Sequence, residues 1–541
     1  MNKLYVFAIG GSGERVMNSL VMLLAAGMEV EPTIVPVFID NDLQSYALRK
    51  SLELIKYYNS NSDDKGLFSV CQDARNDKRD VTFCRAKIDD PIVLSKADEG
   101  EAIGNLNNVI GAIKSDNSVQ NEINLEKDLL FTSSDLNMPL NVGFIGNPNV
   151  GSVVMNCTSL NNENFEEILN GANSTDRIIV VGSLFGGTGA SGIPLIVNKF
   201  LSKNEGANNK NNDKPLIAGL SILPYFTFTE GDCCEKLNRK DLRKYDVDAK
   251  SFDSKTRAAL IYYDQYMRGL DYLYYVGDGA NKVTYPHKKG GSEQQNPAHI
   301  VELLSALSII DFSKGKRTEK VIYKSPAWNV DIMEQEDKSR KIPEKLSKVL
   351  NLSGILCAEL KKSLVKFQLM KAIFETEGMM NEYIRQRRPF VRNIGFTNEI
   401  LSGVIREDNP SGEKYWGLSH LFKEWAQWTN DLKCEINQEQ RAFFLYNDRK
   451  NVDSAKINET ITTLFYSSRD GVEKDFGIAK AESGFLFGTK PQDPEIIEEL
   501  IDACRKAGDK TETIHDEMCI SKMMSYMSTA LDNVISKTCI N

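Results

Sequence analysis

Glycine and hydroxyl residues gather in one short stretch near the middle of the chain. The run GGTGAS at residues 186–191 follows the apolar run 178–181. Glycine lacks a Cβ and tolerates positive φ, so the backbone N–H groups of such a loop can converge on one anion. The hydroxyls of Thr188 and Ser191 could reach a phosphate oxygen or a magnesium-bound water. The predicted phosphate-binding residues are Gly186, Gly187, Thr188, Gly189, Ala190 and Ser191.

The elements around this loop are predicted from the pattern on its two sides. An apolar run precedes it, and apolar residues at helical spacing follow it, which indicates a strand, a loop and then a helix that begins near Ser191. The unpaired N–H groups at the start of this helix would add to the anion site. The loop contains no lysine, which separates it from the GxxxxGK[ST] phosphate loop. A tight turn that binds no ligand is the alternative.

A second glycine loop lies close to the N-terminus. The apolar run 4–9 ends in Gly10, Gly11, Ser12 and Gly13, and apolar residues then recur at helical spacing. This pattern predicts a buried parallel strand that leads into a helix. The dinucleotide fingerprint GxGxxG would need glycine where Val16 stands, which weakens an NAD-binding interpretation.

Polar residues follow two more predicted strands. The strand 34–39 contains Pro36, which indicates a bulge or an edge-like irregularity, and it ends in DNDLQ at 40–44. Open α/β sheets bind ligands beyond the carboxyl ends of their strands, although a plain turn is also consistent with this run. The strand 141–145 ends in another glycine loop at 146–151. The predicted ligand-binding residues of these loops are Asn41, Asp42, Gln44, Gly146 and Asn147.

The remaining pattern divides the chain into an α/β part and a helical part. Strands are predicted at 216–223, 272–276 and 321–323, and a helix is predicted over the run 294–312, with Asn296 at its start and Pro297 in its first turn. His299 could face a base or cap this helix. Charge replaces periodicity at 313–320, which predicts a boundary. Further helices are predicted at 343–386, 415–433, 494–507 and 516–536, and amphipathic helices of this kind usually pack on their own domain.

Composition limits the classes of function. The chain has 541 residues, of which 41% are hydrophobic and 26% are charged, and its formal charge is −9. The negative charge argues against a general nucleic-acid binder. Ten cysteines without a CxxC spacing, and four histidines that lie apart in sequence, disfavour zinc and disulfides and favour a reducing cytoplasm. Neither a signal peptide nor a membrane-spanning segment is expected.

Five of these segments resemble, in chain order, motifs of the tubulin/FtsZ family. Residues 186–194 are similar to the GGGTGTGAAP signature, with departures at Phe185 and Ser191. The other four are residues 10–18, which resemble the first phosphate loop GGGGSNAVN, 40–44, which resemble NTDAQ, 146–151, which resemble the γ-phosphate loop GANPEVG, and 224–231, which resemble PFxFEG but are two residues longer.

The resemblance implies roles for further residues. Glu230 corresponds to the glutamate that contacts the ribose, and Asn296 corresponds to the asparagine that reads guanine. The family's hydrolytic loop NxDxx[DE] acts on the nucleotide of a neighbouring subunit, and the run NVDIME at 329–334 matches it. Asp331 and Glu334 would then be the catalytic acids. An ordinary acidic turn is the alternative.

The resemblance also implies an architecture and a function. The expected fold class is α/β, with an N-terminal tubulin/FtsZ-like GTP-binding domain at 1–312 built on a parallel sheet, and with an insertion at about 45–139. A mostly helical C-terminal domain is expected at 313–541. The expected ligands are GTP or GDP with Mg²⁺. The leading hypothesis is a cytoplasmic, cytoskeletal GTPase that assembles head to tail into filaments of itself.

Two other hypotheses stay open. A non-hydrolysing nucleotide-binding scaffold would keep the site and recruit a protein partner through its helical C-terminal half. A Rossmann-like NAD-dependent enzyme would use Asp40 for a ribose and would leave the loop at 186–191 idle. No nucleic-acid or membrane partner is expected.

Overall fold

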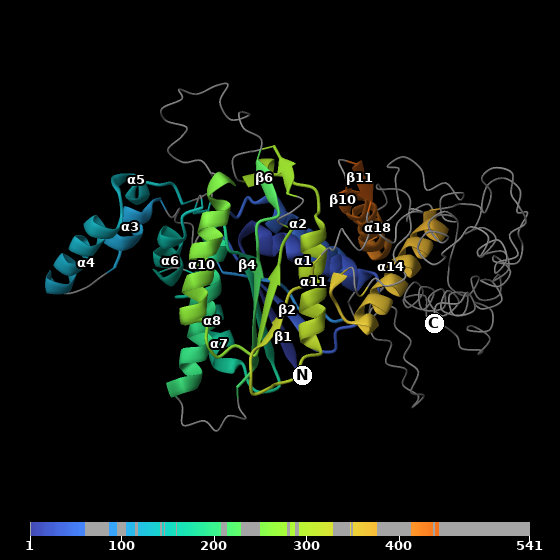
Figure 1. The fold of residues 1–541 in the computed structure, drawn as a ribbon, viewed down its shortest axis with the longest axis horizontal. Coiled ribbons are helices and arrows are strands. Elements are labelled where there is room, and N and C mark those ends of the chain that lie inside the picture. Colours follow the sequence, from blue (N-terminus) through green and yellow to red (C-terminus); the bar gives the residue numbers. More distant parts are fainter. Residues whose placement is uncertain are drawn as a thin grey trace, which may run out of the picture.

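A computed structural model of the chain describes most of the first two thirds and parts of the remainder (Figure 1). The described residues are 2–59, 86–94, 104–113, 117–140, 143–144, 146–157, 159–206, 214–228, 249–278, 282–286, 291–327, 347, 350–375, 413–436 and 439–442.

The core is a sheet of seven parallel strands in the order β3-β2-β1-β4-β5-β7-β9. The strands are β1 (Lys3–Ile9), β2 (Thr33–Ile39), β3 (Ile92–Val93), β4 (Arg177–Ser183), β5 (Leu216–Ile222), β7 (Tyr272–Val276) and β9 (Ile322–Lys324). Parallel strands need crossover connections, which place helices on the faces of the sheet. The predicted α/β class with a parallel sheet is therefore confirmed.

Helices cover both faces of this sheet (Figure 1). On one face lie α1 (Gly10–Ala25), α2 (Tyr46–Asn59) and α11 (Ile300–Ser313). On the other face lie α3 (Leu106–Gly111), α6 (Pro148–Cys157), α7 (Glu163–Gly171), α8 (Gly187–Gly206) and α10 (Phe252–Tyr266). Alternate residues of β1 join the two clusters, since Val6 packs with the first set of helices and Phe7 with the second. Burial on both faces explains why the strands are apolar throughout.

The described C-terminal helices form a further layer on the α1 side (Figure 1). They are α14 (Gly354–Glu375) and α18 (Glu413–Asp431), and Phe367, Trp425 and Trp428 bury their rings in the cluster that contains α1 and α2. The indole Nε1 of Trp428 donates to Ser19 Oγ at 3.0 Å. The apolar faces of α14 and α18 therefore pack against helices of the same chain. The helices predicted at 494–507 and 516–536 lie outside the described residues.

Two features bear on the predicted division of the chain. The range 45–139 supplies α2 and β3 to the α/β body, and β9 extends the sheet beyond residue 312. The division at residues 312 and 313 stays a prediction.

Pro36 lies in a strand that keeps its register with β1. On the other side of β2 the pairing is interrupted, because Ile34 bridges Ile88 and the ladder resumes only where Val37 meets Ile92. The predicted irregularity is thus present on one side of the strand, where a residue without an N–H group is tolerated.

The smaller elements complete the described chain. They are α4 (Asn117–Leu130), α5 (Ser133–Leu136), the parallel pair β6 (Phe226–Phe228) and β8 (Val283–Tyr285), the antiparallel pair β10 (Lys433–Ile436) and β11 (Glu439–Ala442), and 3₁₀ turns at Ala249–Ser251 and Gly291–Glu293.

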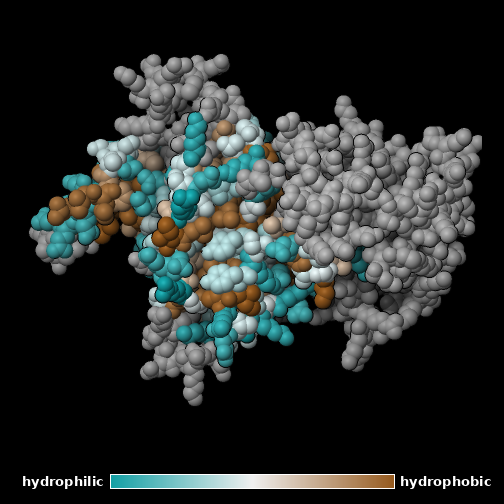
Figure 2. All heavy atoms as spheres, in the orientation of Figure 1, coloured by the Kyte–Doolittle hydropathy of each residue, from teal (hydrophilic) through white to brown (hydrophobic). Residues whose placement is uncertain are grey.

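Helix α4 projects from the body, and apolar residues gather on this projection (Figure 2). Leu125, Leu129 and Leu130 are among the exposed large apolar residues. None of the helices in the described ranges combines the length and the apolar character needed to cross a bilayer.

Candidate functional site

The strand order contains a switch point between β1 and β4. From these two neighbouring strands the chain winds outward in opposite directions, toward β3 on one side and β9 on the other. Open α/β sheets bind ligands in the crevice at such a point, beyond the carboxyl ends of the strands. Helix α1 begins at Gly10, directly after β1, and α8 begins at Gly187, shortly after β4. Two helix N-termini, each with unpaired N–H groups, therefore meet this edge of the sheet.

The two glycine loops at the switch point touch each other. Gly10 has φ of +64°, in the left-handed region that favours glycine. A Cβ on Gly10 would lie 3.1 Å from the Cβ of Thr188 and 3.7 Å from the backbone nitrogen of Gly189. The sequence predicted both runs as loops, and the structure brings the two runs together as the first turns of α1 and α8. The predicted start of the second helix near Ser191 is wrong, since α8 begins at Gly187.

A third loop closes on the same point. Gly143 and Gly146 have φ of +78° and +67°. A Cβ on Gly187 would lie 2.8 Å from the Cβ of Phe144 and 3.1 Å from the backbone nitrogen of Gly146. A Cβ on Gly143 would lie 3.7 Å from Thr188 Oγ1 and 3.9 Å from Asp40 Oδ1. The residues that follow β1, β2 and β4 thus meet Gly143 and its neighbour Phe144 around Thr188 and Gly187.

The reason for glycine in the 186–189 loop differs from the predicted one. Gly186, Gly187 and Gly189 do not have positive φ. They are needed because the chain folds too closely for a Cβ, which on Gly189 would lie 2.6 Å from the backbone nitrogen of Ser183 and on Gly186 would lie 2.8 Å from its Oγ. The steric argument for glycine holds, and the argument from backbone conformation does not.

Phe185 and Ser191, the two departures from the family signature, both have packing explanations. The Phe185 ring lies 4.7 Å from that of Phe252 and 5.5 Å from that of Phe226. The hydroxyl of Ser191 donates to the carbonyl oxygens of Gly187 at 2.8 Å and Thr188 at 3.0 Å. Ser191 is therefore bonded within its own helix, and its predicted role as a ligand hydroxyl is not supported by these contacts.

Other predicted residues have mixed outcomes. Asn147 caps α6, since its Oδ1 accepts from the backbone nitrogens of Asn149 and Val150, and its Nδ2 donates to Asp135. Ala190 is buried beside the other loop residues. Gln44 is exposed and Gly11 and Ser12 are half-buried at the edge of the site. Thr188 is buried, and its hydroxyl makes no hydrogen bond with any residue that the structure describes.

A buried acidic group lies beside these loops. Asp40, Asn41 and Asp42 are buried as predicted for a site at the end of β2, and Glu14, which the sequence reasoning missed, is fully buried. Ser45 Oγ donates to Glu14 Oε2 at 2.9 Å. Within the described chain, Asn41 Nδ2 is buried without a hydrogen-bond partner, and the Glu14 and Asp40 carboxyls lie close enough to share a hydrogen bond when one is protonated.

The pKa values of two carboxyls in this group, those of Glu14 and Asp40, are raised. Burial, followed by the negative charge of Asp40, raises the pKa of Glu14 well above its ordinary value. Burial raises the pKa of Asp40 to about 7, although the N–H groups of Asp42 and Asn41 favour its charged form. Burial favours the protonated form of each carboxyl, because ionisation in a site of low polarity is costly. Perturbed groups of this kind gather at functional sites.

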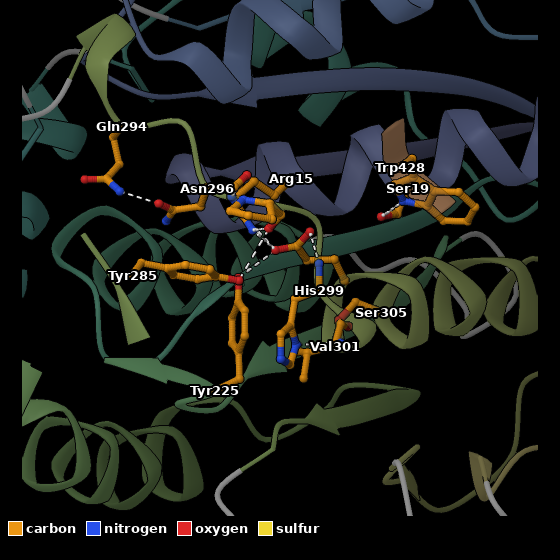
Figure 3. A network of polar contacts seen from close by, with 12 residues as sticks. Arg15, Ser19, Tyr225, Tyr285, Gln294, Asn296, His299, Val301, Ser305 and Trp428 are labelled. Carbon is orange, nitrogen blue, oxygen red and sulfur yellow. Dashed lines mark hydrogen bonds and ion pairs between the residues drawn. The ribbon is translucent and has the colours of Figure 1, made fainter. Parts of the chain in front are cut away.

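A second network joins α1 to the segment that precedes α11 (Figure 3). Arg15 donates from Nε to Glu302 Oε1 at 2.6 Å, from Nη1 to the Asn296 carbonyl at 3.0 Å, and from Nη2 to the Pro297 carbonyl at 2.7 Å. Tyr225 Oη donates to the same Glu302 oxygen at 2.9 Å. Sequence reasoning missed this network, although Glu302 is the one charged residue in the apolar run 300–310.

Asn296 and His299 take different positions in this network. Asn296 is half-buried, and its Oδ1 accepts a hydrogen bond from Gln294 Nε2. His299 caps α11 through its Nδ1, which accepts from the backbone nitrogen of Val301 at 3.2 Å. Burial, aided by the positive charge of Arg15, lowers the pKa of His299 to about 3. Of the roles predicted for His299, the structure supports the one in which it caps the N-terminus of α11.

The segment that carries Asn296 also meets the end of β2. The backbone nitrogen of Gly291 donates to Asp42 Oδ2 at 2.5 Å, and a Cβ on Gly291 would lie 3.9 Å from the Cβ of Gln44. Asn296 therefore lies in a segment that is hydrogen-bonded both to Asp42 and to Arg15. Arg15 itself follows the glycine run 10–13 by two residues.

Three predicted residues, Glu230, Asp331 and Glu334, lie outside the described residues. Among the residues that are described, no group of three or more His, Cys, Asp or Glu side chains is arranged to hold a metal ion. No known protein-family model matches the chain, and no curated protein gives a significant match to it.

Proposed function

We propose that this chain is a tubulin/FtsZ-like GTP-binding protein, a GTPase that assembles head to tail into filaments. The observation that supports the proposal is the meeting of the glycine-rich first turns of α1 and α8 with Gly143, Phe144 and Gly146 at the switch point of a parallel sheet. Two helix N-termini and close-packed glycine backbone suit a polyphosphate, which such a site binds through N–H groups and helix dipoles.

Polar groups around the loops fit the phosphate end of a nucleotide. Thr188 Oγ1 and Asp40 Oδ1 both border Gly143. Mg²⁺ in nucleotide sites usually takes one or two protein oxygens and fills its remaining positions with phosphate oxygens and water. Thr188 and Asp40 would supply the protein oxygens, and a bound cation would favour the ionised form of Asp40.

The direct test is the identity and affinity of the bound nucleotide. The protein is purified without added nucleotide, released small molecules are identified by mass, and the dissociation constants for GTP, GDP, ATP and NAD are measured by calorimetry with and without Mg²⁺. We expect guanine nucleotides to bind at least ten-fold more tightly than ATP and NAD. Preferential NAD binding would favour the Rossmann-like enzyme and reject the proposal.

Assembly and hydrolysis need a separate test. Phosphoryl transfer depends mainly on positioning and charge stabilisation, and Asp331 and Glu334 are proposed to supply the acids that act on a neighbour's nucleotide. GTP turnover per molecule should then rise with protein concentration, together with light scattering from filaments. A head-to-tail contact is heterologous and leaves an open end for growth. Turnover that is independent of concentration would contradict coupling to assembly.

The scaffold and NAD alternatives receive less support. The buried apolar faces of α14 and α18 are already occupied by the chain's own helices α1 and α2. Asp40, which an NAD-binding enzyme would direct at a ribose, is buried beneath the loop that contains Gly143. Nucleotide binding without turnover at any protein concentration would nonetheless favour the scaffold.

A further inference from the structure

Two side-chain amides and one carbonyl form a chain that fixes the orientation of Asn296. The Pro286 carbonyl oxygen can only accept a hydrogen bond, so the atom of Gln294 that faces it at 3.4 Å is Nε2. The same Nε2 donates to Asn296, so the Asn296 atom that it meets is the acceptor Oδ1 (Figure 3). An amide turned the other way would place two donors against each other.

The backbone of Asn296 is held independently. Arg15 Nη1 donates to its carbonyl oxygen at 3.0 Å, and Arg15 Nη2 donates to the next carbonyl, that of Pro297, at 2.7 Å. Arg15 is itself fixed by Glu302, whose side chain is 2% exposed. With the backbone and Oδ1 both held, Asn296 offers its Nδ2 group as a donor, and within the described chain no protein acceptor takes it.

We propose that Gln294 is a specificity-determining residue that makes this site select purine nucleotides with an oxygen at C6. The inference rests on the proposed function, because it assumes that the base of a bound nucleotide reaches Asn296. A fixed N–H donor pairs with the C6 oxygen of guanine or hypoxanthine and opposes the amino group that adenine carries there. Because Oδ1 is engaged by Gln294, the contact does not depend on the 2-amino group of guanine.

The first experiment compares three nucleotides on the wild-type protein. Dissociation constants for GTP, ITP and ATP are measured by calorimetry in the same buffer. ITP, which has the C6 oxygen but lacks the 2-amino group, should bind within about five-fold of GTP, and ATP should bind at least ten-fold more weakly, in line with the loss of one buried hydrogen bond. ITP that binds more than ten-fold more weakly than GTP would overturn the inference and leave the proposed function intact.

The second experiment reverses the orientation of the amide. In Gln294→Glu the carboxylate accepts only, so Asn296 turns its Nδ2 toward residue 294 and presents Oδ1 to the base. The ratio of ATP to GTP dissociation constants should fall by at least ten-fold. The matched control is Gln295→Glu, which adds the same charge one residue away on an exposed side chain that donates to Ser292. That control should keep the wild-type ratio.

The outcomes separate the two claims. A folded Gln294→Glu protein with the wild-type ratio, or a Gln295→Glu protein with an equal change in ratio, overturns the inference, because orientation of Asn296 would not set the preference. If the variant fails to fold, the wild-type comparison of ITP with GTP decides alone. A wild-type protein that binds no guanine or hypoxanthine nucleotide overturns the proposed function itself.

Discussion

The two ends of the site are built in opposite ways. At the glycine-rich starts of α1 and α8, the candidate ligand surface is formed largely by backbone, because a Cβ on Gly187 or Gly189 would meet other main-chain atoms within about 3 Å. At the other end, the segment that carries Asn296 is held from below by Arg15, Glu302 and Tyr225, largely buried side chains from three distant segments that are joined by hydrogen bonds. The first end depends on backbone segments that pack closely against one another, and the second end depends on hydrogen bonds between long polar side chains.

This difference predicts which substitutions should disrupt each end of the site. Adding atoms should damage the glycine loops, since their backbone has no space for them. Removing atoms should damage the Arg15 network, since it would leave buried polar groups without partners. Four substitutions or conditions test this contrast, from the largest expected effect to the smallest.

The largest effect on ligand affinity is expected for Gly187→Val. The first added carbon would lie 2.8 Å from the Cβ of Phe144 and 3.1 Å from the backbone nitrogens of Gly146 and Asn147. Overpacking of this kind costs about 1–3 kcal/mol and shifts the backbone, so the affinity for GTP should fall by about 100-fold. Calorimetric titration of the folded variant checks this.

The matched control for Gly187 is Gly171→Val. Gly171 ends α7, and a Cβ there would meet no atom within 4 Å. Its affinity for GTP should equal that of the wild type. A Gly187→Val protein that is folded and binds GTP normally would show that close approach at this loop does not form the ligand surface.

The contrast also explains what the sequence could predict. Glycine spacing is local, so the loops at 10–13 and 186–191 and the strands before them could be located without any structure. The partners of side chains are not local. Arg15 and Glu302 are 287 residues apart, and Asn147 caps α6 while it donates to Asp135. Their roles depend on the fold that brings the segments together.

Close approach is equally invisible in a sequence. The run 186–189 is compatible both with positive φ and with tight packing, and only the position of Ser183 and Phe144 decides between them. The hidden Glu14 is a similar case, because a carboxyl directly after a glycine loop is expected to be solvated unless other elements cover it. The charge of Glu302 within an apolar helix was the one local signal that pointed to a buried ion pair.

The largest effect on stability is expected for Arg15→Met. Glu302 is 2% exposed, and the loss of its partner would leave a buried carboxylate without a cation. Breaking a buried pair in this way costs about 3–5 kcal/mol. Urea unfolding monitored by circular dichroism should show this loss of stability, and the affinity for GTP should weaken because the Asn296 segment is released from α1.

A double variant separates the lost charge from lost packing. In Arg15→Met with Glu302→Gln, the amide oxygen can accept from the backbone nitrogen of His299 and the amide NH2 group can donate to Tyr225 Oη, but no charge is buried. Most of the lost stability should return. If the double variant is as unstable as Arg15→Met alone, packing of the arginine side chain, rather than the uncompensated charge, dominates at this end of the site.

A smaller effect is expected from pH. The pKa of Asp40 is raised to about 7, above its value of about 4 in the unfolded chain. Between these values the folded protein holds a proton that the unfolded chain has released, so stability should fall as pH rises from about 4 to about 7, by up to about 1.4 kcal/mol per pH unit from this group. Burial raises the pKa of Glu14 as well, and its contribution has the same sign.

The variant Asp40→Asn isolates this contribution. Its oxygen can still accept from the backbone nitrogen of Asp42, a bond of 3.0 Å in the wild type, but it does not titrate. Urea midpoints at pH 5.5, 6.5 and 7.5 should therefore vary less in the variant than in the wild type. Identical pH profiles would show that Asp40 is ionised in the folded protein at all three values.

The smallest effect is expected at the far side of α1, where the C-terminal helix α18 docks. Trp428 is 4% exposed and its Nε1 donates to Ser19 Oγ at 3.0 Å. In Ser19→Ala this donor loses its acceptor, which costs about 1–2 kcal/mol, whereas Ser19→Ala with Trp428→Phe removes both partners and should recover part of the loss. Urea unfolding measures the stability of both variants.

Ser19 lies in α1 beyond the glycine run and does not border the site, so the dissociation constant for GTP should stay within two-fold of the wild type. A larger change in affinity would mean that the docking of α18 positions α1 for its ligand, and the contrast between backbone and side-chain surfaces would then have to include the C-terminal helices as a third support of the site.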